Sequence, residues 1–239
     1  MKLASDTAMV MAAGLGKRMR PLTAAQPKPL IRVAGRSLID HALDRLHDAG
    51  VARAVVNVHY LADALEAHVR ARAAPMIAIS DERERLLETG GGMVKANAEG
   101  LLPDPFFCVN ADSIWLDGPR GAFGDLSQHW DAARMDAMLL LVPHVRARNF
   151  AGSGDFYMDP VGRLRRKLAG RIAPYIYTGI QLVSRHLLRD APEGAFSTNI
   201  LWDRAIEEGR LFGTVFTGEW FEVGEPAHVT ATEGHLAGG

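Results

Sequence analysis

The first half of the chain alternates short apolar runs with stretches whose apolar residues recur every three or four positions. The runs predict buried strands, and the recurring pattern predicts amphipathic helices. One helix is well marked, because Ser37 can cap its N-terminus and Gly50 can end it. The pattern predicts strands at residues 7–13, 54–58, 76–80, 106–110 and 137–142, and helices between Ser37 and Gly50, at 62–72, from near Gly92 and at 123–134.

The second half has a different pattern. Residues 155–158 and 163–165 flank the turn sequence Asp-Pro-Val-Gly and predict a hairpin. Further strands are expected at 175–183, 211–216 and 220–223, and further helices at 200–208 and from Pro226. Strands that alternate with helices indicate a parallel sheet covered on both faces. The expected fold class is α/β, with a Rossmann-like, mostly parallel central sheet flanked by helices and a mixed, β-rich second half.

Length and apolar content set the domain organisation. The 239 residues, 48% of them apolar, suit one large domain or two small ones. No internal repeat and no linker stands out along the chain. We therefore expect a single domain over residues 1–239, with one half over about 1–145 and another over about 146–239.

Charge and cysteine content narrow the class of partner. A formal net charge of −1 argues against nucleic acid or an anionic membrane as the main partner. The apolar run from Ala8 is too short for a signal peptide, and no stretch is long enough to span a bilayer. Cys108 is the single cysteine, so neither an internal disulfide nor a zinc cluster is expected. It lies in an apolar run and is expected to pack as a small hydrophobe. The expected compartment is the cytoplasm.

A glycine-rich turn follows the first predicted strand, in the segment Met9–Thr23. Gly14 and Gly16 lie two positions apart and let backbone N–H groups approach a phosphate with no Cβ in the way. Basic side chains nearby supply charge-assisted donors to the same anion. These side chains are Lys17, Arg18, Arg20 and Lys28. The segment therefore predicts a site for a nucleoside triphosphate.

Two common phosphate motifs do not fit this turn. A Walker loop ends in Gly-Lys-Ser/Thr, whereas Arg18 follows Gly16-Lys17, and a dinucleotide fingerprint needs a glycine where Met19 stands. The turn resembles the signature of the sugar nucleotidyltransferase family, Ala-Ala-Gly-x-Gly-x-Arg-x-Arg-Pro-Leu-Thr followed by Pro-Lys-Pro. Residues 12–23 and 27–29 fit this signature at every specified position. The alternative is an ordinary strand-to-loop turn with solvated basic residues, which this spacing disfavours.

The resemblance implies that a sugar 1-phosphate attacks the α-phosphorus of a nucleoside triphosphate and that pyrophosphate leaves. The attacking oxygen is already an anion, so the work is to bring two anions together and to neutralise charge. Arg18, Lys28 and Asp112 would do this together with Mg²⁺. Asn57, near the end of the second predicted strand, is a candidate to read the base, and a structural role for it is equally open. The residues implied to bind the nucleotide are Ala12, Ala13, Gly14, Gly16, Lys17, Asn57, Thr89 and Gly90.

A second glycine run, Glu88–Gly92, is expected as a loop that leads into the next helix. Its glycines let a flat ring or a ribose approach the backbone closely, although such a run is also typical of a flexible turn. The run resembles the nucleobase-side loop of the same family. The sequence Leu-Glu-Thr-Gly-Gly-Gly resembles in particular the N-acetylmuramate-1-phosphate uridylyltransferase branch.

Two carboxylates are candidates for a metal site. Asp112 follows the fourth predicted strand, and ligands bind at the carboxyl ends of parallel strands. Capping of the next segment is the alternative role for this residue. The family pattern Asn/Gly-x-Asp, matched by residues 110–112, implies a metal ligand. Trp220–Pro226 resembles the later motif Trp-x-Asp-x-Gly-Thr-Pro, with Glu222 in place of the second ligand and Glu225 in place of the threonine. The resemblance implies Mg²⁺ held by Asp112 and Glu222.

The second half carries candidate contacts to the sugar. Tyr177–Gln181 resembles the family's sugar-side strand, in which a glycine lets the hexose lie against the backbone, and residues 196–199 precede a helix. Strand core and helix N-cap are equally open roles for these two segments. The family's Glu-Lys-Pro motif, whose lysine binds the sugar phosphate, is not recognisable. One of residues 165–167 replaces it, or these charges form a solvated hairpin face. The expected sugar contacts are Glu88, Asn110, Gly179 and Asn199.

The hypothesis is thus transfer of a uridylyl group from UTP to N-acetylmuramate 1-phosphate, giving a nucleotide sugar and pyrophosphate. A mannose-1-phosphate guanylyltransferase or a glucose-1-phosphate nucleotidyltransferase of the same family is one alternative. A non-catalytic nucleotide-sugar sensor on the same fold is another. The expected partners are small-molecule substrates, with no nucleic acid and no membrane, and the oligomeric state is left open.

Overall fold

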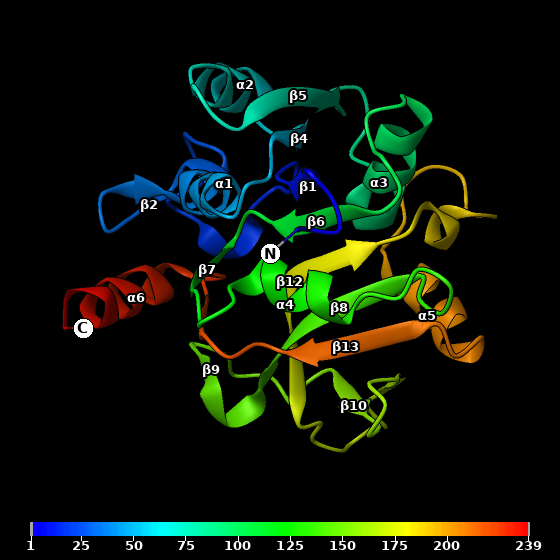
Figure 1. Ribbon diagram of the computed structural model, residues 1–239. Helices are drawn as coiled ribbons and strands as arrows, with labels where there is room; N and C mark the ends of the chain where they lie inside the picture. The colour runs from blue at the N-terminus through cyan, green and yellow to red at the C-terminus, as the bar shows by residue number, and fades with distance from the viewer. Residues whose placement is uncertain (1, 239) are drawn as a thin grey trace.

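A computed structural model describes residues 2–238. Its centre is a mixed sheet of nine strands, in the order β11-β10-β12-β6-β1-β4-β5, with β8 and β13 joined to the other edge of β12 (Figure 1). The strands are β1 (Thr7–Met11), β4 (Arg53–Val58), β5 (Met76–Asp81), β6 (Phe106–Asn110), β8 (Ala137–Pro143), β10 (Phe156–Met158), β11 (Leu164–Arg166), β12 (Tyr175–Val183) and β13 (Leu211–Val215). The expected class, a mostly parallel sheet flanked by helices, is confirmed.

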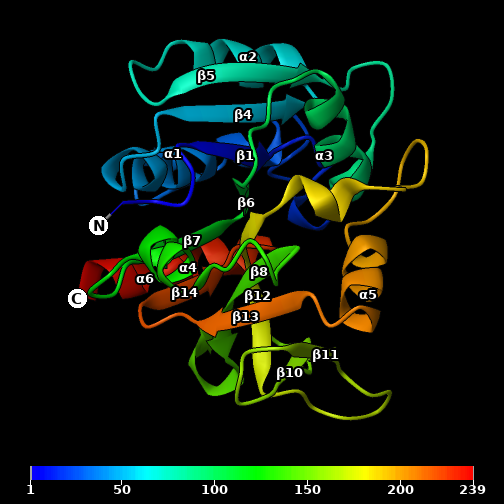
Figure 2. The ribbon, with the colours of Figure 1, turned by 45° about the vertical axis from the view of Figure 1, so that its right-hand side comes forward.

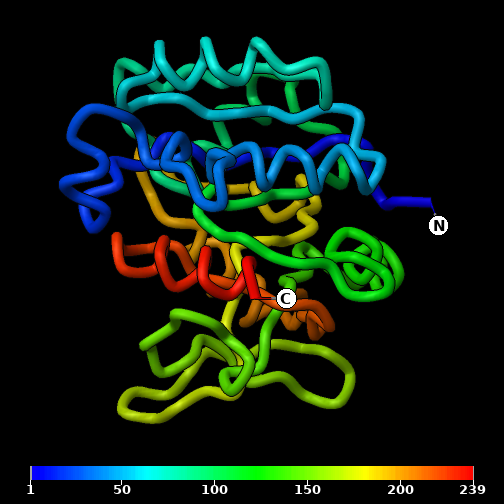
Figure 3. Tube along the Cα trace, turned by 90° about the vertical axis from the view of Figure 1, so that its left-hand side faces the viewer, coloured from blue at the N-terminus to red at the C-terminus, as the bar shows by residue number. Residues whose placement is uncertain are grey.

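Helices cover both faces of this sheet, as the turned views show (Figures 2 and 3). They are α1 (Leu38–Asp48), α2 (Ala62–Arg70), α3 (Glu88–Ala98), α4 (Ala122–His129) and α5 (Asn199–Glu207). The last helix, α6 (Pro226–Gly238), packs in a separate apolar cluster beside this sheet. Side chains of α1, α2 and α4 pack in one apolar cluster with Ala8 and Val10 of β1, and those of α3 and α5 pack in another with Met9. Alternate residues of one strand thus serve two cores, as expected for a sheet buried on both faces. No helix within residues 2–238 is long and apolar enough to span a membrane.

The order of the parallel strands creates a crevice. Strand β1 pairs in parallel with β4 on one side and with β6 on the other, so their carboxyl ends meet at one edge. The chain turns toward β4 first and reaches β6 later, which makes the β1–β6 boundary a topological switch point. Ligands bind at such points in open α/β sheets. Met11 and Asn110, the last residues of these two strands, face each other across this boundary.

Strand β12 widens the same crevice. Its first residue, Tyr175, pairs with β10, whereas its last residues, Ile180 to Val183, pair antiparallel with β6. Its pairing with β8 shifts between Tyr177 and Gln181. Gly179 lies at the shift with φ +86°, and a Cβ there would come within 3.0 Å of the Asn110 Cβ. The glycine therefore allows the strand to bend away from the end of β6.

Two predicted helix boundaries are wrong by about a turn or more, and two other elements are shorter than predicted, since α2 ends at Arg70 rather than at 72 and β1 ends at Met11 rather than at 13. Helix α4 ends at His129 rather than at 134, because the side chain of Asp131 accepts the Ala133 N–H and organises a turn. Helix α3 begins at Glu88 rather than near Gly92. Its glycines are therefore the first turns of a helix and not a loop. By contrast, α1 begins after Ser37 as predicted, and the Ser37 hydroxyl accepts the Asp40 N–H at 3.2 Å.

Two smaller sheets complete the fold. A hairpin of β2 (Arg32–Val33) and β3 (Arg36–Ser37) precedes α1. A three-stranded sheet joins β7 (Ser113–Leu116), β14 (Glu219–Glu222) and β9 (Ala147–Arg148). The sequence pattern predicts β14 alone of these three strands. The register of this sheet sets Glu222 opposite Ser113, and the Val223 N–H donates to the carbonyl of Asp112 at 3.3 Å. Two distant segments with carboxylates thus become neighbours.

Candidate active site

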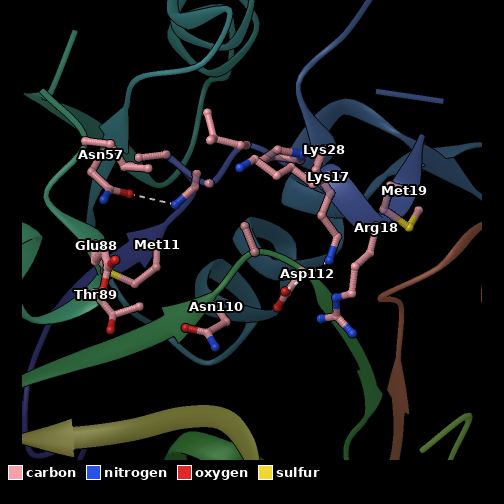
Figure 4. A pocket seen from close by; sticks show the side chains of 18 of the residues that line it. Met11, Lys17, Arg18, Met19, Lys28, Asn57, Glu88, Thr89, Asn110 and Asp112 are labelled. Atoms are coloured by element: carbon pink, nitrogen blue, oxygen red, sulfur yellow. Dashed lines mark hydrogen bonds and ion pairs between the residues drawn. The ribbon is translucent and has the colours of Figure 1, made fainter. Parts of the chain in front are cut away.

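A cavity of about 590 Å³ opens at the crevice between β1 and β6. This volume is typical of small-molecule sites. Its lining has two chemically different ends (Figure 4). Lys17, Arg18 and Lys28 lie at one end, and Asn57, Glu88 and Thr89 lie at the other. One end therefore suits a polyanion, and the other offers hydrogen-bonding groups without a cation.

The glycine-rich turn shapes the basic end. Gly14 lines the cavity, and a Cβ at this position would meet no atom within 4 Å, so the backbone faces open space there. Gly16 has φ +59°, and a Cβ would lie 2.9 Å from Thr23 Cγ2 and 3.0 Å from Lys28 Cβ. The Thr23 hydroxyl donates to the Gly16 carbonyl at 2.9 Å. Gly14 thus leaves room for a ligand, whereas Gly16 lets the turn close on Thr23 and Lys28.

Two of the three cations at this end face a carboxylate. Lys28 Nζ lies 3.1 Å from Asp112 Oδ2, and Arg18 Nη1 lies 3.6 Å from Glu222 Oε1. The Arg18 side chain is 65% exposed and that of Asp112 is 43% exposed. Ion pairs in contact with water are weak and exchangeable. Gly224 keeps the second pair together, because a Cβ there would crowd both Arg18 and Glu222.

Asn57 connects the end of the cavity opposite the cations to the glycine-rich turn. Its side-chain oxygen accepts the Ala12 N–H at 2.6 Å, and its amide nitrogen donates to Glu82 at 2.8 Å. Glu82 is buried, and its other oxygen accepts the Leu87 N–H at 3.0 Å. Burial raises the pKa of the Glu82 carboxyl, although both donors act to lower it. Asn57 lines the cavity but has both ends of its amide engaged, so it holds the turn in place.

The three glycines of α3 pack against protein rather than facing the cavity. A Cβ on Gly90 would overlap the ring of Phe196, and one on Gly91 would overlap the carbonyl of Gly194. One on Gly92 would lie 2.7 Å from Glu82 Oε1. The carbonyl of Phe196 accepts the N–H groups of Gly90 and Gly91, which satisfies the start of the helix. Glycine is needed at these positions for close packing. The packing contacts stabilise the residues as a helix although glycine has low helix propensity.

A second cavity of about 130 Å³ continues the first toward the second half of the chain. The two cavities share Met11, Thr89, Asn110 and Ser197 in their walls. Asn199 of α5 lines the second cavity, as do Tyr177 and Trp202, whose rings pack edge to face with centroids 4.9 Å apart.

The structure brings most of the predicted site residues to these two cavities. Gly179 bends β12 at their edge, and Glu222 reaches the basic end through Arg18. Two predicted residues lie elsewhere. Gly90 packs on Phe196, and Arg20 is not part of either wall. The predicted residues in the walls are Ala12, Ala13, Gly14, Gly16, Lys17, Arg18, Lys28, Asn57, Glu88, Thr89, Asn110, Asp112 and Asn199.

Sequence reasoning missed Glu82 and Trp202. Glu82 follows β5, and a buried acid after a strand is a weak signal on its own. Trp202 lies on the buried face of α5, where a large aromatic residue usually indicates core packing. The prediction that Cys108 packs as a small hydrophobe is confirmed, since it is buried and burial raises the pKa of its thiol to about 12.

Comparison with known proteins identifies one matching family and two similar proteins that share a name. The model of the nucleotidyl transferase family matches residues 7–151. The chain is 47% identical to N-acetylmuramate alpha-1-phosphate uridylyltransferase of Caulobacter vibrioides, with 99% of each chain covered. It is 33% identical to the protein of the same name from Neisseria meningitidis serogroup B, covering 91% of this chain and 92% of that one.

Solved structures share the fold. The inositol-1-phosphate CTP transferase from T. maritima superposes with a TM-score of 0.78, covering 100% of this chain and 97% of the other. The two sequences are 18% identical, so this likeness concerns the architecture alone.

Proposed function

The chain belongs to the nucleotidyl transferase family and is a sugar-1-phosphate nucleotidyltransferase, and on this premise we propose that it transfers a uridylyl group from UTP to N-acetylmuramate 1-phosphate. The choice of these two substrates rests on one observation. The chain is 47% identical, over nearly its whole length, to a protein that is named for this reaction. The products would be the uridine diphosphate sugar and pyrophosphate.

The basic end of the cavity suits the triphosphate. The backbone at Gly14 faces open space, so phosphate oxygens can approach its N–H group. Lys28 is largely buried, with 11% of its side chain exposed, and its charge is therefore less screened by water than that of Arg18. We assign to Lys28 and Arg18 the neutralisation of negative charge that grows on the α-phosphate and on the leaving pyrophosphate. The attacking sugar phosphate is already anionic and needs no general base.

The residues beside these cations fit a magnesium ion. Asp112 and Glu222 offer carboxylate oxygens, the ligands that Mg²⁺ prefers, and the β7–β14 register brings their backbones together. Within residues 2–238 no three His, Cys, Asp or Glu side chains gather into a metal site, so an ion held here would take its other ligands from waters and substrate phosphates. When bound, Mg²⁺ would supply positive charge to the triphosphate and orient it. Lys28 and Arg18 already pair with these two carboxylates and would turn to the phosphates.

A substrate panel tests the proposal. Purified protein is incubated with Mg²⁺, one of UTP, GTP, CTP or dTTP, and one of N-acetylmuramate, N-acetylglucosamine, mannose or glucose 1-phosphate. Release of pyrophosphate is followed. We expect the highest kcat/KM with UTP and N-acetylmuramate 1-phosphate. A preference for GTP with mannose 1-phosphate would overturn the choice of substrates and leave the reaction class intact. Binding of nucleotide sugars without any pyrophosphate release would favour a sensor.

A further inference from the structure

The second cavity, which we call the sugar-side cavity on the basis of the proposed function, has an uncharged wall. Its described lining residues supply hydroxyl, amide, thiol and aromatic groups, with no acid and no base among them. Such groups suit the hydroxyls and the acetamido group of a hexose. A negatively charged substituent on the sugar would find no charged partner in this wall, and burying an unpaired carboxylate is costly. A charged substituent would therefore need a cation from outside this wall, either from the basic end of the first cavity or from a side chain packed behind the wall.

Arg166 of β11 is placed behind this wall. Its Nη2 donates to the Asn199 side-chain oxygen at 3.0 Å and to the Asn199 carbonyl at 3.2 Å. The guanidinium also lies over the ring of Trp202, with its central carbon 5.6 Å from the ring centroid, and over Phe156 at 5.0 Å. Asn199 and Trp202 both line the sugar-side cavity. The guanidinium is thus one side chain away from the cavity and is held in orientation by two aromatic rings.

The ionic partner of Arg166 is exchangeable. Arg166 Nε donates to Asp203 Oδ1 at 2.6 Å. The Asp203 side chain is 55% exposed, so it returns to water at little cost when another carboxylate takes its place. The stacking on Trp202 does not depend on Asp203. Arg166 therefore combines a fixed guanidinium plane with a replaceable anion.

The proposed substrate carries an anion that matches this arrangement. N-acetylmuramate differs from N-acetylglucosamine by a lactyl ether on O3, which ends in a carboxylate. The planar guanidinium binds a carboxylate through two parallel hydrogen bonds, which lysine cannot do. Resting on the proposed function, we infer that Arg166 exchanges Asp203 for the lactyl carboxylate and so selects muramate over glucosamine substrates. Its neighbours in the sequence do not share this position, since Arg165 is exposed and Lys167 Nζ donates to Ser153.

The test compares two sugar phosphates that differ only in the lactyl group. We measure kcat/KM with UTP for N-acetylmuramate 1-phosphate and for N-acetylglucosamine 1-phosphate, and we define the preference as their ratio. Arg166→Gln should lower the preference by about 10- to 100-fold, since a charge-assisted hydrogen bond is lost with the first substrate only. Arg166→Lys should lower it by a smaller factor. Arg165→Gln, on the adjacent and exposed position, is the matched control and should leave the preference unchanged.

Asp203→Asn gives a second, independent arm. If Asp203 competes with the lactyl carboxylate for Arg166, this variant should keep or raise the preference. An equal fall in kcat/KM for both sugars in Arg166→Gln would overturn the inference, because it would mean that Arg166 only supports the cavity wall. A fall of the preference in Asp203→Asn would overturn it as well. Should Arg166→Gln not fold, Arg166→Lys and Asp203→Asn decide the question by the same ratio. If instead the wild-type protein lacks the preference, it is the proposed substrate that fails.

Discussion

The molecule contains two clusters of charged residues that differ in how deeply their carboxylates are buried and in how many partners each carboxylate has. At the basic end of the cavity, Asp112 and Glu222 each face one cation, and the Asp112 side chain is 43% exposed. At the junction of β8, β12 and β13, Asp136 is 1% exposed and receives His186, Arg189 and Arg210. The Asp136 carboxylate is surrounded by donors, whereas the Asp112 carboxylate is half open to water.

The difference indicates what each cluster is for. Three donors on a buried carboxylate offset its desolvation and tie Arg210, which precedes β13, to Arg189 and His186, which follow β12. An exchangeable pair in a cavity contributes little to stability but leaves each partner free for a ligand. We therefore assign the Asp136 cluster to the fold and the Asp112 cluster to the reaction. Substitutions in the two clusters should separate activity from stability.

The largest expected effect is on activity at Asp112. Asp112→Asn should lower kcat by about 10³-fold or more, because it removes the carboxylate that would ligate the metal beside the triphosphate. The unfolding midpoint should stay close to that of the wild type, since the lost ion pair is half exposed. Steady-state pyrophosphate release and thermal unfolding measure the two quantities. A variant with normal turnover would remove Asp112 from the proposed site.

The next effect concerns the two cations. Arg18→Ala and Lys28→Ala should each lower kcat/KM by about 10²-fold, because each removes a preorganised charge that stabilises the transition state. Arg20→Ala is the matched control, since Arg20 belongs to the same motif but not to the cavity wall. Turnover near the wild-type value in both of the first two variants would show that the loop is only a solvated basic face.

The Asp136 cluster should show the reverse behaviour. Asp136→Asn should lower the free energy of unfolding by about 2 to 3 kcal/mol, below the value for fully buried pairs because the three donor side chains keep contact with water. Activity per folded molecule should be unchanged. Chemical denaturation and kcat on the same samples check this pair of results. Loss of activity with unchanged stability would contradict the assignment.

The same residue gives a prediction for acid. Burial alone would raise the pKa of Asp136, but hydrogen bonds from Arg210 and His186 outweigh burial and hold the pKa below its ordinary value of 3.8. A depressed folded-state pKa stabilises the fold above the unfolded-state value, and this stability is lost as the pH falls through the folded-state pKa. Below about pH 4 the wild type should therefore lose stability more steeply than Asp136→Asn.

The smallest effect is expected at Glu222. Glu222→Gln should raise the Mg²⁺ concentration at half-maximal rate by about fivefold, because the longer side chain contributes less than Asp112 to an octahedral ion that keeps its waters. Glu222→Asp should be neutral or should improve the rate. The rate is measured against Mg²⁺ concentration for each variant. If Glu222→Gln titrates like the wild type, Glu222 is not a ligand.

Elements with strong local signals could be predicted from the sequence. Strands β6 and β12 have the predicted bounds, because apolar runs end at polar or turn-forming residues. Helix α1 follows from its cap and its apolar face. The start of α3 could not be predicted, because glycine has low helix propensity and these glycines are held by tertiary packing against Phe196, Gly194 and Glu82. Strands β7 and β9 are short and depend on their pairing with β14.

In the candidate site, too, local motifs could be predicted from the sequence and contacts between distant segments could not. Gly14, Arg18 and Lys28 lie in one contiguous motif, so their shared location in the cavity could be predicted. The contact of Asn57 with Glu82 and that of Arg166 with Asn199 join residues 25 and 33 positions apart. No local pattern marks such contacts, because they depend on how strands and helices meet in space.

The most direct test of the central claim is phosphorus NMR of a reaction with UTP, N-acetylmuramate 1-phosphate and Mg²⁺. Nucleotidyl transfer predicts a new pair of coupled resonances from the diphosphate bridge of a nucleotide sugar, together with pyrophosphate. Both should disappear when Asp112→Asn replaces the wild type. Formation of orthophosphate or free UMP in place of the bridged product, or an unchanged spectrum, would contradict the account.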